Sequence, residues 1–252
     1  MKKQWIFIAA IALLAACNNE VDDKSNKAFV IKGKVSATDA KKENLIKVPA
    51  SGNEQVLEDS ANLGKDGSFV LASNEKESMI FNLVFDQNRY PVASVINDNP
   101  EIELEIKLRN NSSEFAEDYT IKNSKASEQM KEYMKRMNNG LMSIYNWSMM
   151  ADSLAANQNP PTQQPDSLLA ISRNEAQALY EHTMSSIIKA EDPALAIFEL
   201  GYYKYLAEGS PYGLPPIGHD ETMDILNKTV ERFPNHRAAT AIRAETAKTI
   251  QD

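Results

Sequence analysis

The chain has 252 residues and a formal net charge of −8 at pH 7, and its content of 42% hydrophobic and 25% charged residues is that of an ordinary globular protein. This length is enough for one large or two small domains. An acidic chain without a stripe of Lys and Arg residues is a poor binder of nucleic acid, because such binding depends on neutralising phosphates, so we expect no nucleic-acid partner.

The cysteine content excludes further chemistry. Cys17 is the single cysteine of the chain. The chain therefore cannot form an internal disulfide, a Cys-x-x-Cys redox pair or a metal site built from several thiolates.

Residues 1–16 have the features of a signal peptide. Lys2 and Lys3 form a short positive segment, and the apolar run from Trp5 to Ala16 is shorter than the roughly 20 residues that cross a bilayer core. The run ends in Leu14-Ala15-Ala16-Cys17, which resembles the lipobox of bacterial lipoproteins. This resemblance implies that the peptide before Cys17 is removed and that Cys17 carries fatty acyl chains, such as palmitate, which anchor the protein to a membrane.

Residues 17–27 are polar and are expected to form a lipidated tether. Asn18, rather than an aspartate, follows the cysteine, and in Gram-negative lipoproteins this pattern implies export to the outer membrane. The acidic cluster that follows resembles tags for the cell surface, so the periplasmic and the surface face both stay open. Two simpler interpretations also stay open, namely an ordinary signal peptide with an incidental cysteine and an N-terminal membrane helix.

Residues 28–123 are expected to form a domain of short β-strands. Ile102, Leu104, Ile106 and Leu108 alternate with charged residues, which predicts a strand with one buried and one solvated face. Asp66-Gly67 predicts a tight hairpin, since glycine tolerates the positive φ that such turns require. Strands are expected within residues 29–35, 45–48, 56–57, 69–71, 79–85, 90–96, 101–108 and 115–121. About eight short strands with turns between them favour an antiparallel sandwich.

Residues 124–252 are expected to form an all-α region of about five helices, because the hydrophobic period changes from two to between three and four. Ser124 is expected to cap the first helix, Asp166 the second and Asn235 the last. Asp192-Pro193 combines a cap with a proline at the first position of the third helix. Breaks are expected at residues 157–165, 210–218 and 234–235, with the third helix ending at Gly209, the fourth over residues 221–233 and the last ending near residue 250. The predicted fold class is therefore α+β.

Short motifs of the strand half resemble a known family. They are Phe29-x-Ile31-x-Gly33, Asp59-Ser60 followed by Asp66-Gly67-Ser68-Phe69, and the exit through Asn123-Ser124 into a long helix. These motifs resemble the N-terminal DUF4369 domain of lipid-anchored thiol-disulfide oxidoreductases of the thioredoxin-like TlpA/ResA type. The helical half, with its Phe233-Pro234-Asn235 break, resembles the spacer of those proteins. In that family a thioredoxin domain with a Trp-Cys-x-x-Cys motif follows the spacer, whereas this chain stops at Asp252, so the resemblance implies anchor, β domain and spacer but no redox activity.

Two groups of side chains are candidates for a ligand or partner surface. Tyr202, Tyr205 and Tyr212 lie beside a loop rich in proline and glycine and could form a platform for a ligand or peptide. The alternative is that they cover a seam between helices while Tyr203 faces the core. Trp147, with two methionines after it, could form an adaptable partner surface, and the alternative is again core packing.

No catalytic residues, metal ligands or cofactors are expected. The three histidines, His182, His219 and His236, lack the spacing of a metal site. Asp220-Glu221 beside His219 has a sufficient explanation in the preference of acidic residues for the first turn of a helix.

These features together predict a non-catalytic lipoprotein of the cell envelope that holds a partner near the membrane. The partner could be a separately encoded thioredoxin-like protein or another envelope protein. Two alternatives stay open. In the first, Asp252 ends a truncated product, the N-terminal portion of a lipid-anchored oxidoreductase. In the second, the chain is a peptide- or glycan-binding module that uses the tyrosine group.

Overall fold

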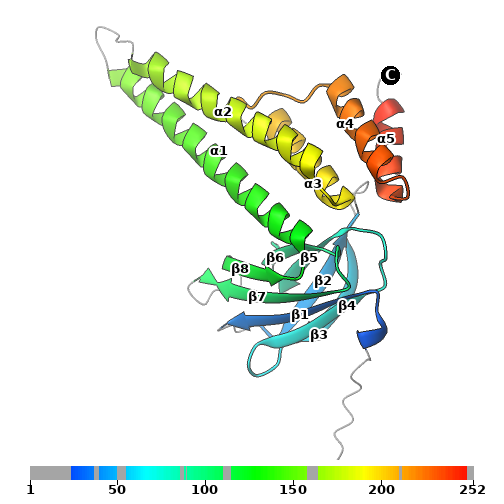
Figure 1. Ribbon diagram of the computed structural model, residues 1–252. Helices are drawn as coiled ribbons and strands as arrows, with labels where there is room; N and C mark the ends of the chain where they lie inside the picture. Colours follow the sequence, from blue (N-terminus) through cyan, green and yellow to red (C-terminus); the bar gives the residue numbers. More distant parts are fainter. Residues whose placement is uncertain are drawn as a thin grey trace, which may run out of the picture.

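The computed structural model shows an α+β protein in which two β-sheets are followed by five helices within the described residues (Figure 1). The structure describes residues 24–36, 40–49, 55–85, 88, 90–109, 115–157, 164–209 and 212–248. The predicted signal peptide, Cys17 and most of the predicted tether lie outside these ranges. Among the helices inside them, none has the length and hydrophobicity that crossing a membrane requires.

The strands form two four-stranded sheets that share one core, as expected for a sandwich. The first sheet has the order β4-β1-β7-β8 and the second the order β3-β2-β5-β6. Their bounds are β1 (Phe29–Ser36), β2 (Lys42–Val48), β3 (Val56–Asn62), β4 (Ser68–Ser73), β5 (Ile80–Phe85), β6 (Ala93–Ile96), β7 (Glu101–Leu108) and β8 (Ala116–Lys122). Ile31 and Leu71 of the first sheet and Leu45, Phe81 and Leu83 of the second all pack in this core.

The period-two pattern of β7 is confirmed residue by residue. Ile102, Leu104, Ile106 and Leu108 are buried, and the charged residues between them are exposed. The exposed face is crossed by ion pairs such as that between Lys122 and Glu103, at 3.2 Å. Such exposed pairs add little stability, so the buried face determines which way β7 faces.

Two of the short motifs meet in space across β1 and β4. Gly33 pairs with Phe69, and a Cβ on Gly33 would lie 1.9 Å from Phe69 Cζ, so the buried ring needs a glycine beneath it. Gly67 has φ +80°, and a Cβ there would lie 2.0 Å from the carbonyl oxygen of Val35. Both positions therefore require glycine for close packing, and Gly67 requires it for its backbone conformation as well.

The strand pairing differs from the expectation in two respects. β1 pairs with β7 in parallel, so the sandwich is not antiparallel throughout. The Asp66-Gly67 turn forms, but it does not close a two-stranded hairpin, because β3 pairs with β2 while β4 pairs with β1. The turn instead carries the chain from one sheet to the other. The Asp66-Gly67 pair therefore predicts the local backbone conformation of the turn, but it does not predict which strands pair with each other.

The last residues of the predicted tether lie against the sandwich. Lys24–Asn26 form a 3-10 turn, η1. Lys24 Nζ lies 2.6 Å from Asp59 Oδ2 on β3 and donates to the carbonyl oxygen of Val70 at 3.0 Å. This segment therefore reaches the seam between the two sheets.

The five helices are α1 (Lys125–Asn157), α2 (Gln164–Lys189), α3 (Pro193–Gly209), α4 (His219–Arg232) and α5 (Arg237–Lys248). Two predicted caps are confirmed. Ser124 Oγ accepts from the N–H of Ser127 at 3.2 Å, and Asp192 Oδ1 accepts from the N–H of Ala194 at 2.8 Å. Helix boundaries predicted near Gly209 and in the following loop agree with α3 and α4 within a few residues.

Two other predicted caps are wrong. α2 begins at Gln164, so Asp166 lies inside its first turn, where an acidic residue still favours the helix dipole. α5 begins at Arg237, and His236 caps it in place of Asn235, with Nδ1 accepting from the N–H of Ala239 at 3.1 Å. Histidine is not among the preferred cap residues, so the propensity argument missed it.

The sandwich and the helices are joined by hydrogen bonds that are buried or partly buried. Ser127 Oγ accepts from the N–H of Ile96 at 2.7 Å, and Asp98 Oδ2 accepts from the N–H of Ala126 at 2.8 Å, which ties α1 to the end of β6. On the other side of the junction, Ser78 Oγ donates to the carboxylate of Asp192 at 2.7 Å. Such satisfied buried networks hold the two parts in one arrangement.

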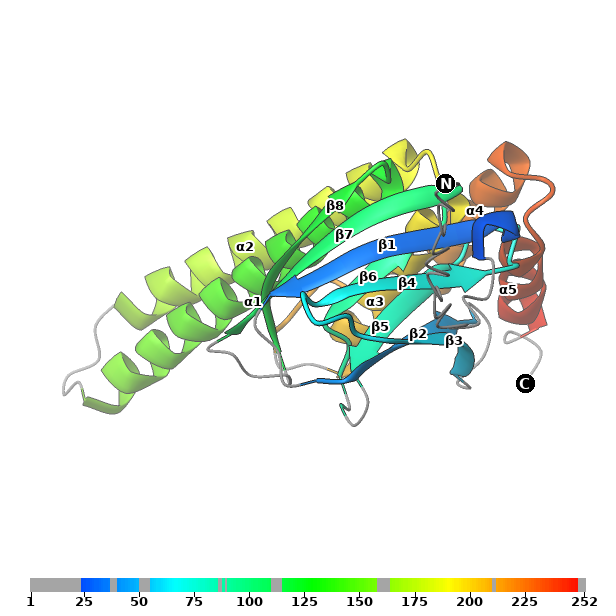
Figure 2. The same ribbon diagram turned by 90° about the horizontal axis from the view of Figure 1, so that it is seen from below.

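The α1–α2 hairpin extends beyond the sandwich in both views (Figures 1 and 2). α1 begins beside β6 and β8 and runs away from them, α2 returns alongside it, and α3 lies back near the sheets. The α4–α5 pair lies on the opposite side of α3 from α1 in Figure 1. The hairpin tip and the α3–α5 region are thus two separate exposed parts of the helical half.

Candidate functional site

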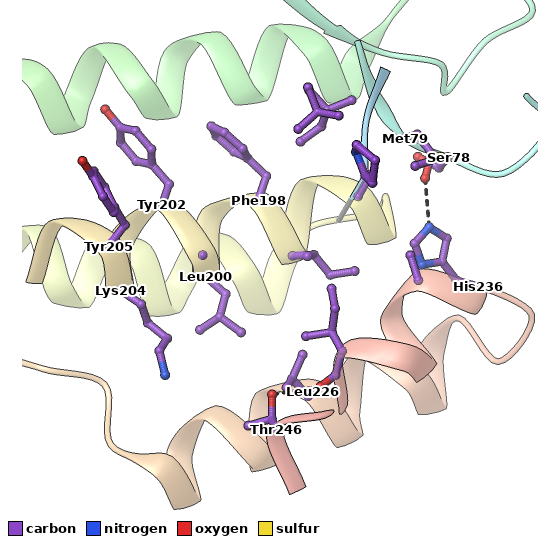
Figure 3. Close-up of a pocket in the computed structure, with 18 of the residues that line it drawn as sticks. Ser78, Met79, Phe198, Leu200, Tyr202, Lys204, Tyr205, Leu226, His236 and Thr246 are labelled. Carbon is purple, nitrogen blue, oxygen red and sulfur yellow. Dashed lines mark hydrogen bonds between the residues drawn. The ribbon is translucent and has the colours of Figure 1, made fainter. Parts of the chain in front are cut away.

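An apolar cleft opens where the helices meet the ends of the inner strands β2 and β5 of the second sheet. It has a volume of about 430 Å³ and lies between α3, the α4–α5 pair and the segment that leads into β5. Figure 3 shows side chains of α3 along its length, Leu226 and Thr246 on the α4–α5 side, and Ser78 with Met79 at the end near the sandwich. A cleft of this size can receive a small ligand or a few side chains of a partner.

Segments far apart in the sequence supply the apolar walls. Val48 and Ile80 come from β2 and β5, Phe198 from α3, Leu226 from α4 and Ile242 from α5. Water in contact with such walls is released when an apolar group replaces it, and this release is the main driving force for association. The cleft is therefore suited to an apolar group.

Gly201 keeps the wall formed by α3 open. A Cβ at this position would meet nothing within 4 Å among the described residues. Glycine inside a helix costs about 1 kcal/mol relative to alanine, so Gly201 weakens α3 without relieving any clash within the described chain. It does allow an external group to approach the helix backbone closely.

Within the described residues, the cleft is lined by basic side chains and not by acidic ones, although the chain as a whole is acidic. Lys204 and His236 line it, and no carboxylate is among the described lining residues, although the net charge is −8. Lys204 Nζ donates to Thr222 Oγ1 at 3.2 Å and lies 3.9 Å from Glu208 Oε1. Since an ammonium has three donors, Lys204 can also bind an acceptor on a ligand.

His236 has a structural role at the sandwich end of the cleft. Because its Nδ1 accepts from the N–H of Ala239, Nε2 carries the proton and donates to the carbonyl oxygen of Ser78 at 2.9 Å (Figure 3). The other histidines lie elsewhere: His182 stacks on Tyr133 with ring centroids 5.9 Å apart, and His219 begins α4. Within the ranges that the structure describes, no His, Cys, Asp and Glu side chains form a group that could hold a metal.

The structure brings together two of the predicted surface residues. Tyr202 and Tyr205 both line the cleft, and Tyr205 is 76% exposed at its rim. Tyr202 stacks on Phe198 with ring centroids 5.5 Å apart. Tyr203 is fully buried and faces the core, as the packing alternative predicts.

The other predicted site residues lie apart from the cleft. Tyr212 packs against the helical core and does not line the cleft. Trp147 lines a separate groove of about 350 Å³ on the outside of α1. Cys17, predicted to carry the lipid, lies outside the described residues.

Sequence reasoning missed most of the cleft. Met79, Ile80 and Leu226 have the periodicity of ordinary core residues, and only the tertiary fold leaves one side of them open. Gly201 was the available signal, because an isolated glycine within a helical pattern costs stability relative to alanine.

A buried carboxyl lies on the face of α3 opposite the cleft. Glu199 is fully buried, its Oε1 accepts from Ser186 Oγ at 2.7 Å, and its Oε2 has no hydrogen-bond partner within the described structure. Burial disfavours the charged form and raises the pKa of Glu199 to about 7. It does not reach the cleft, so we assign it to the stability of the helical core.

The arrangement is that of a two-part α+β protein, a β-sandwich carrying helices that form an apolar cleft. Residues 29–130 match the family model described as "Domain of unknown function (DUF4369)". The match covers the whole sandwich and the first turns of α1, and it confirms the DUF4369 resemblance for that part of the chain. None of the curated proteins compared with this chain matches it.

Proposed function

We propose that this protein is a non-catalytic lipoprotein of the cell envelope that binds a partner protein near the membrane. In this proposal the cleft beside α3 receives an apolar segment of the partner, and a carboxylate of that segment pairs with Lys204. The observation that carries the proposal is the cleft itself, an apolar volume of about 430 Å³ that Gly201 leaves open.

The composition of the cleft supports a protein segment as its occupant. Hot spots of protein interfaces are buried aromatic and apolar anchors in pockets, surrounded by a more polar rim. The apolar walls supply such a pocket, and Tyr205 supplies an exposed aromatic side chain at its rim. Lys204 is the single lysine among the described residues that line the cleft, and it favours a carboxylate over a cationic group on the partner.

The proposed anchor is an acylated Cys17, with the outer membrane as the proposed location. Lys24 is the first described residue and is tied to the sandwich. The seven residue steps from Cys17 to Lys24 span at most about 25 Å when fully extended. The sandwich would therefore stay close to the lipid surface, and a partner bound in the cleft would be held near the membrane.

The resemblance of the strand motifs to lipid-anchored oxidoreductases suggests one class of partner. Because residues 29–130 match the DUF4369 model, and the motifs resemble lipid-anchored thiol-disulfide oxidoreductases, we propose a thioredoxin-like protein as the first partner to test. The same match suits the alternative that this chain is the front portion of such an oxidoreductase. Sequencing the gene beyond the Asp252 codon, together with the intact mass of the native protein, distinguishes these two cases.

Filling the cleft provides the test. Gly201→Leu would place a side chain in the open space, and Gly201→Ala is the matched control, because both variants lose the helix penalty of glycine and only leucine takes up the volume. Crosslinking in intact cells should capture the same envelope protein with the native chain and with Gly201→Ala, and at least about tenfold less of it with Gly201→Leu. Equal capture by all three chains would reject the cleft as the binding site.

A further inference from the structure

The outer face of α1 exposes a stripe of large apolar side chains near the tip of the hairpin. Met142 is 60% exposed, Tyr145 49%, Met149 52% and Met150 51%. Met142, Tyr145 and Met149 lie on the side of α1 that faces away from α2, since Gly140 faces Leu179 of α2 and Ser148 Oγ lies 3.2 Å from Ser172 Oγ of α2. Methionine and aromatic side chains gathered on an exposed face are typical of protein interfaces.

The stripe lies in the longest uncharged part of the helical region. From Met137 to Ala151 the sequence contains no Asp, Glu, Lys, Arg or His, whereas Arg136 precedes this stretch and Asp152 follows it. Depletion of charge is the compositional mark of the central part of an interface. Two copies of a chain with net charge −8 repel each other, so a neutral face is where they can approach.

The spacing of the stripe is that of a helix that packs on another helix. Met142, Tyr145 and Met149 follow one another at steps of three and four residues, the spacing of a and d positions of a heptad. The pattern is close to symmetric about Tyr145. An antiparallel pair of α1 helices related by a two-fold axis would place Met142 of one copy opposite Met149 of the other.

A groove lies on α1 beside the stripe. The groove of about 350 Å³ on α1 is lined by Asn139, Met142, Trp147 and Met150 among others. In a two-fold interface each surface patch must be complementary to itself, with knob and hole on the same patch. The stripe and the groove beside it meet this requirement.

The exposed area is sufficient for a weak dimer. With about half of each of the four large side chains exposed, the stripe offers ~400 Å² per copy, taking about 200 Å² for a large side chain. With the side chains around it, a pair would bury on the order of 1,000 Å², the lower limit for a specific interface. The hairpin extends beyond the sandwich, so its outer face is accessible to a second hairpin (Figures 1 and 2).

We propose that two copies of this chain associate through the outer face of α1, as an antiparallel helix pair across a two-fold axis. The contact centres on Met142, Tyr145 and Met149. It is distinct from the cleft beside α3, so a dimer would present two clefts to partners.

The oligomeric state of the full chain in detergent provides the first test. Sedimentation over a micromolar concentration series should show a monomer–dimer equilibrium. Met142→Glu with Met149→Glu would bring four carboxylates together in the seam and should weaken dimerisation at least ~100-fold. Asn174→Glu with Gln177→Glu adds the same charge on exposed positions of α2 and should leave the equilibrium unchanged, and circular dichroism confirms that each variant is folded.

Disulfide formation tests the geometry. Tyr145→Cys should give a covalent dimer on mild oxidation, because this position lies next to the axis, whereas Met142→Cys and Met149→Cys should each crosslink efficiently only when the two variants are mixed. The parent chain with Cys17 and an Asn174→Cys variant set the background. A native chain that stays monomeric throughout the series, or a dimer that the double Glu variant does not weaken, overturns the proposal.

Discussion

Replacing Glu199 by glutamine should change how the stability of the protein depends on pH. Glu199 is fully buried, and its folded-state pKa of about 7 lies above the ordinary value of 4.5. In this range the folded state binds more protons than the unfolded state, so the free energy of unfolding falls as the pH rises from 4.5 to about 7. At 1.36 kcal/mol for each pKa unit, the loss is about 3 kcal/mol, complete a little above neutral pH.

Urea unfolding measures this difference directly. The free energy of unfolding of the native chain should fall by about 3 kcal/mol relative to that of Glu199→Gln between about pH 4.5 and about pH 8. The comparison cancels the other ionisable groups, such as His182, whose pKa is lowered by burial and acts in the opposite direction. Glu181→Gln, which neutralises an exposed carboxylate on α2, should follow the native chain. Parallel pH profiles for the native chain and Glu199→Gln would refute the assignment of a neutral buried carboxyl.

Three further predictions concern stability and follow from single contacts. Gly33→Ala should lower the free energy of unfolding by about 2 kcal/mol or more, because its Cβ overlaps the ring of Phe69, and a milder loss in the Phe69→Leu background would confirm that cause. Ser124→Ala should cost about 1–2 kcal/mol through the lost cap of α1 and the lost hydrogen bond to Asp98, whereas Ser124→Thr, which keeps the capping hydroxyl, should cost less. Gly201→Ala should raise the stability by up to about 1 kcal/mol, since a methyl group there enters open space, and a loss of stability would show that the cleft is narrower than described.

The sequence predicted the elements of the fold better than their arrangement. Period-two alternation identified β7, and the change of period at Ser124 identified the start of α1, because each depends on one face of one element. The parallel pairing of β1 with β7 joins segments about 70 residues apart, and periodicity states which face is buried but not which strand lies alongside.

The same limit applies to the candidate site. Tyr202 and Tyr205 stood out because aromatic side chains lie close together in the sequence there, and both line the cleft. Tyr212 lies in the same sequence cluster but packs against the helical core. The opposite wall comes from β5 and α5, which are far apart in the sequence. The hydrogen bond from His236 to the carbonyl oxygen of Ser78 holds these two segments together.

The most direct test of partner binding is a photo-crosslink from the rim of the cleft in intact cells. A photoreactive phenylalanine in place of Tyr205 should give one discrete adduct with an envelope protein. Mass spectrometry should map the bond to an apolar segment that contains a carboxylate, and Gly201→Leu should abolish the adduct. The same group in place of Leu57, which is 59% exposed on β3, should not give it. No adduct from position 205, or the same adduct from position 57, would contradict the account.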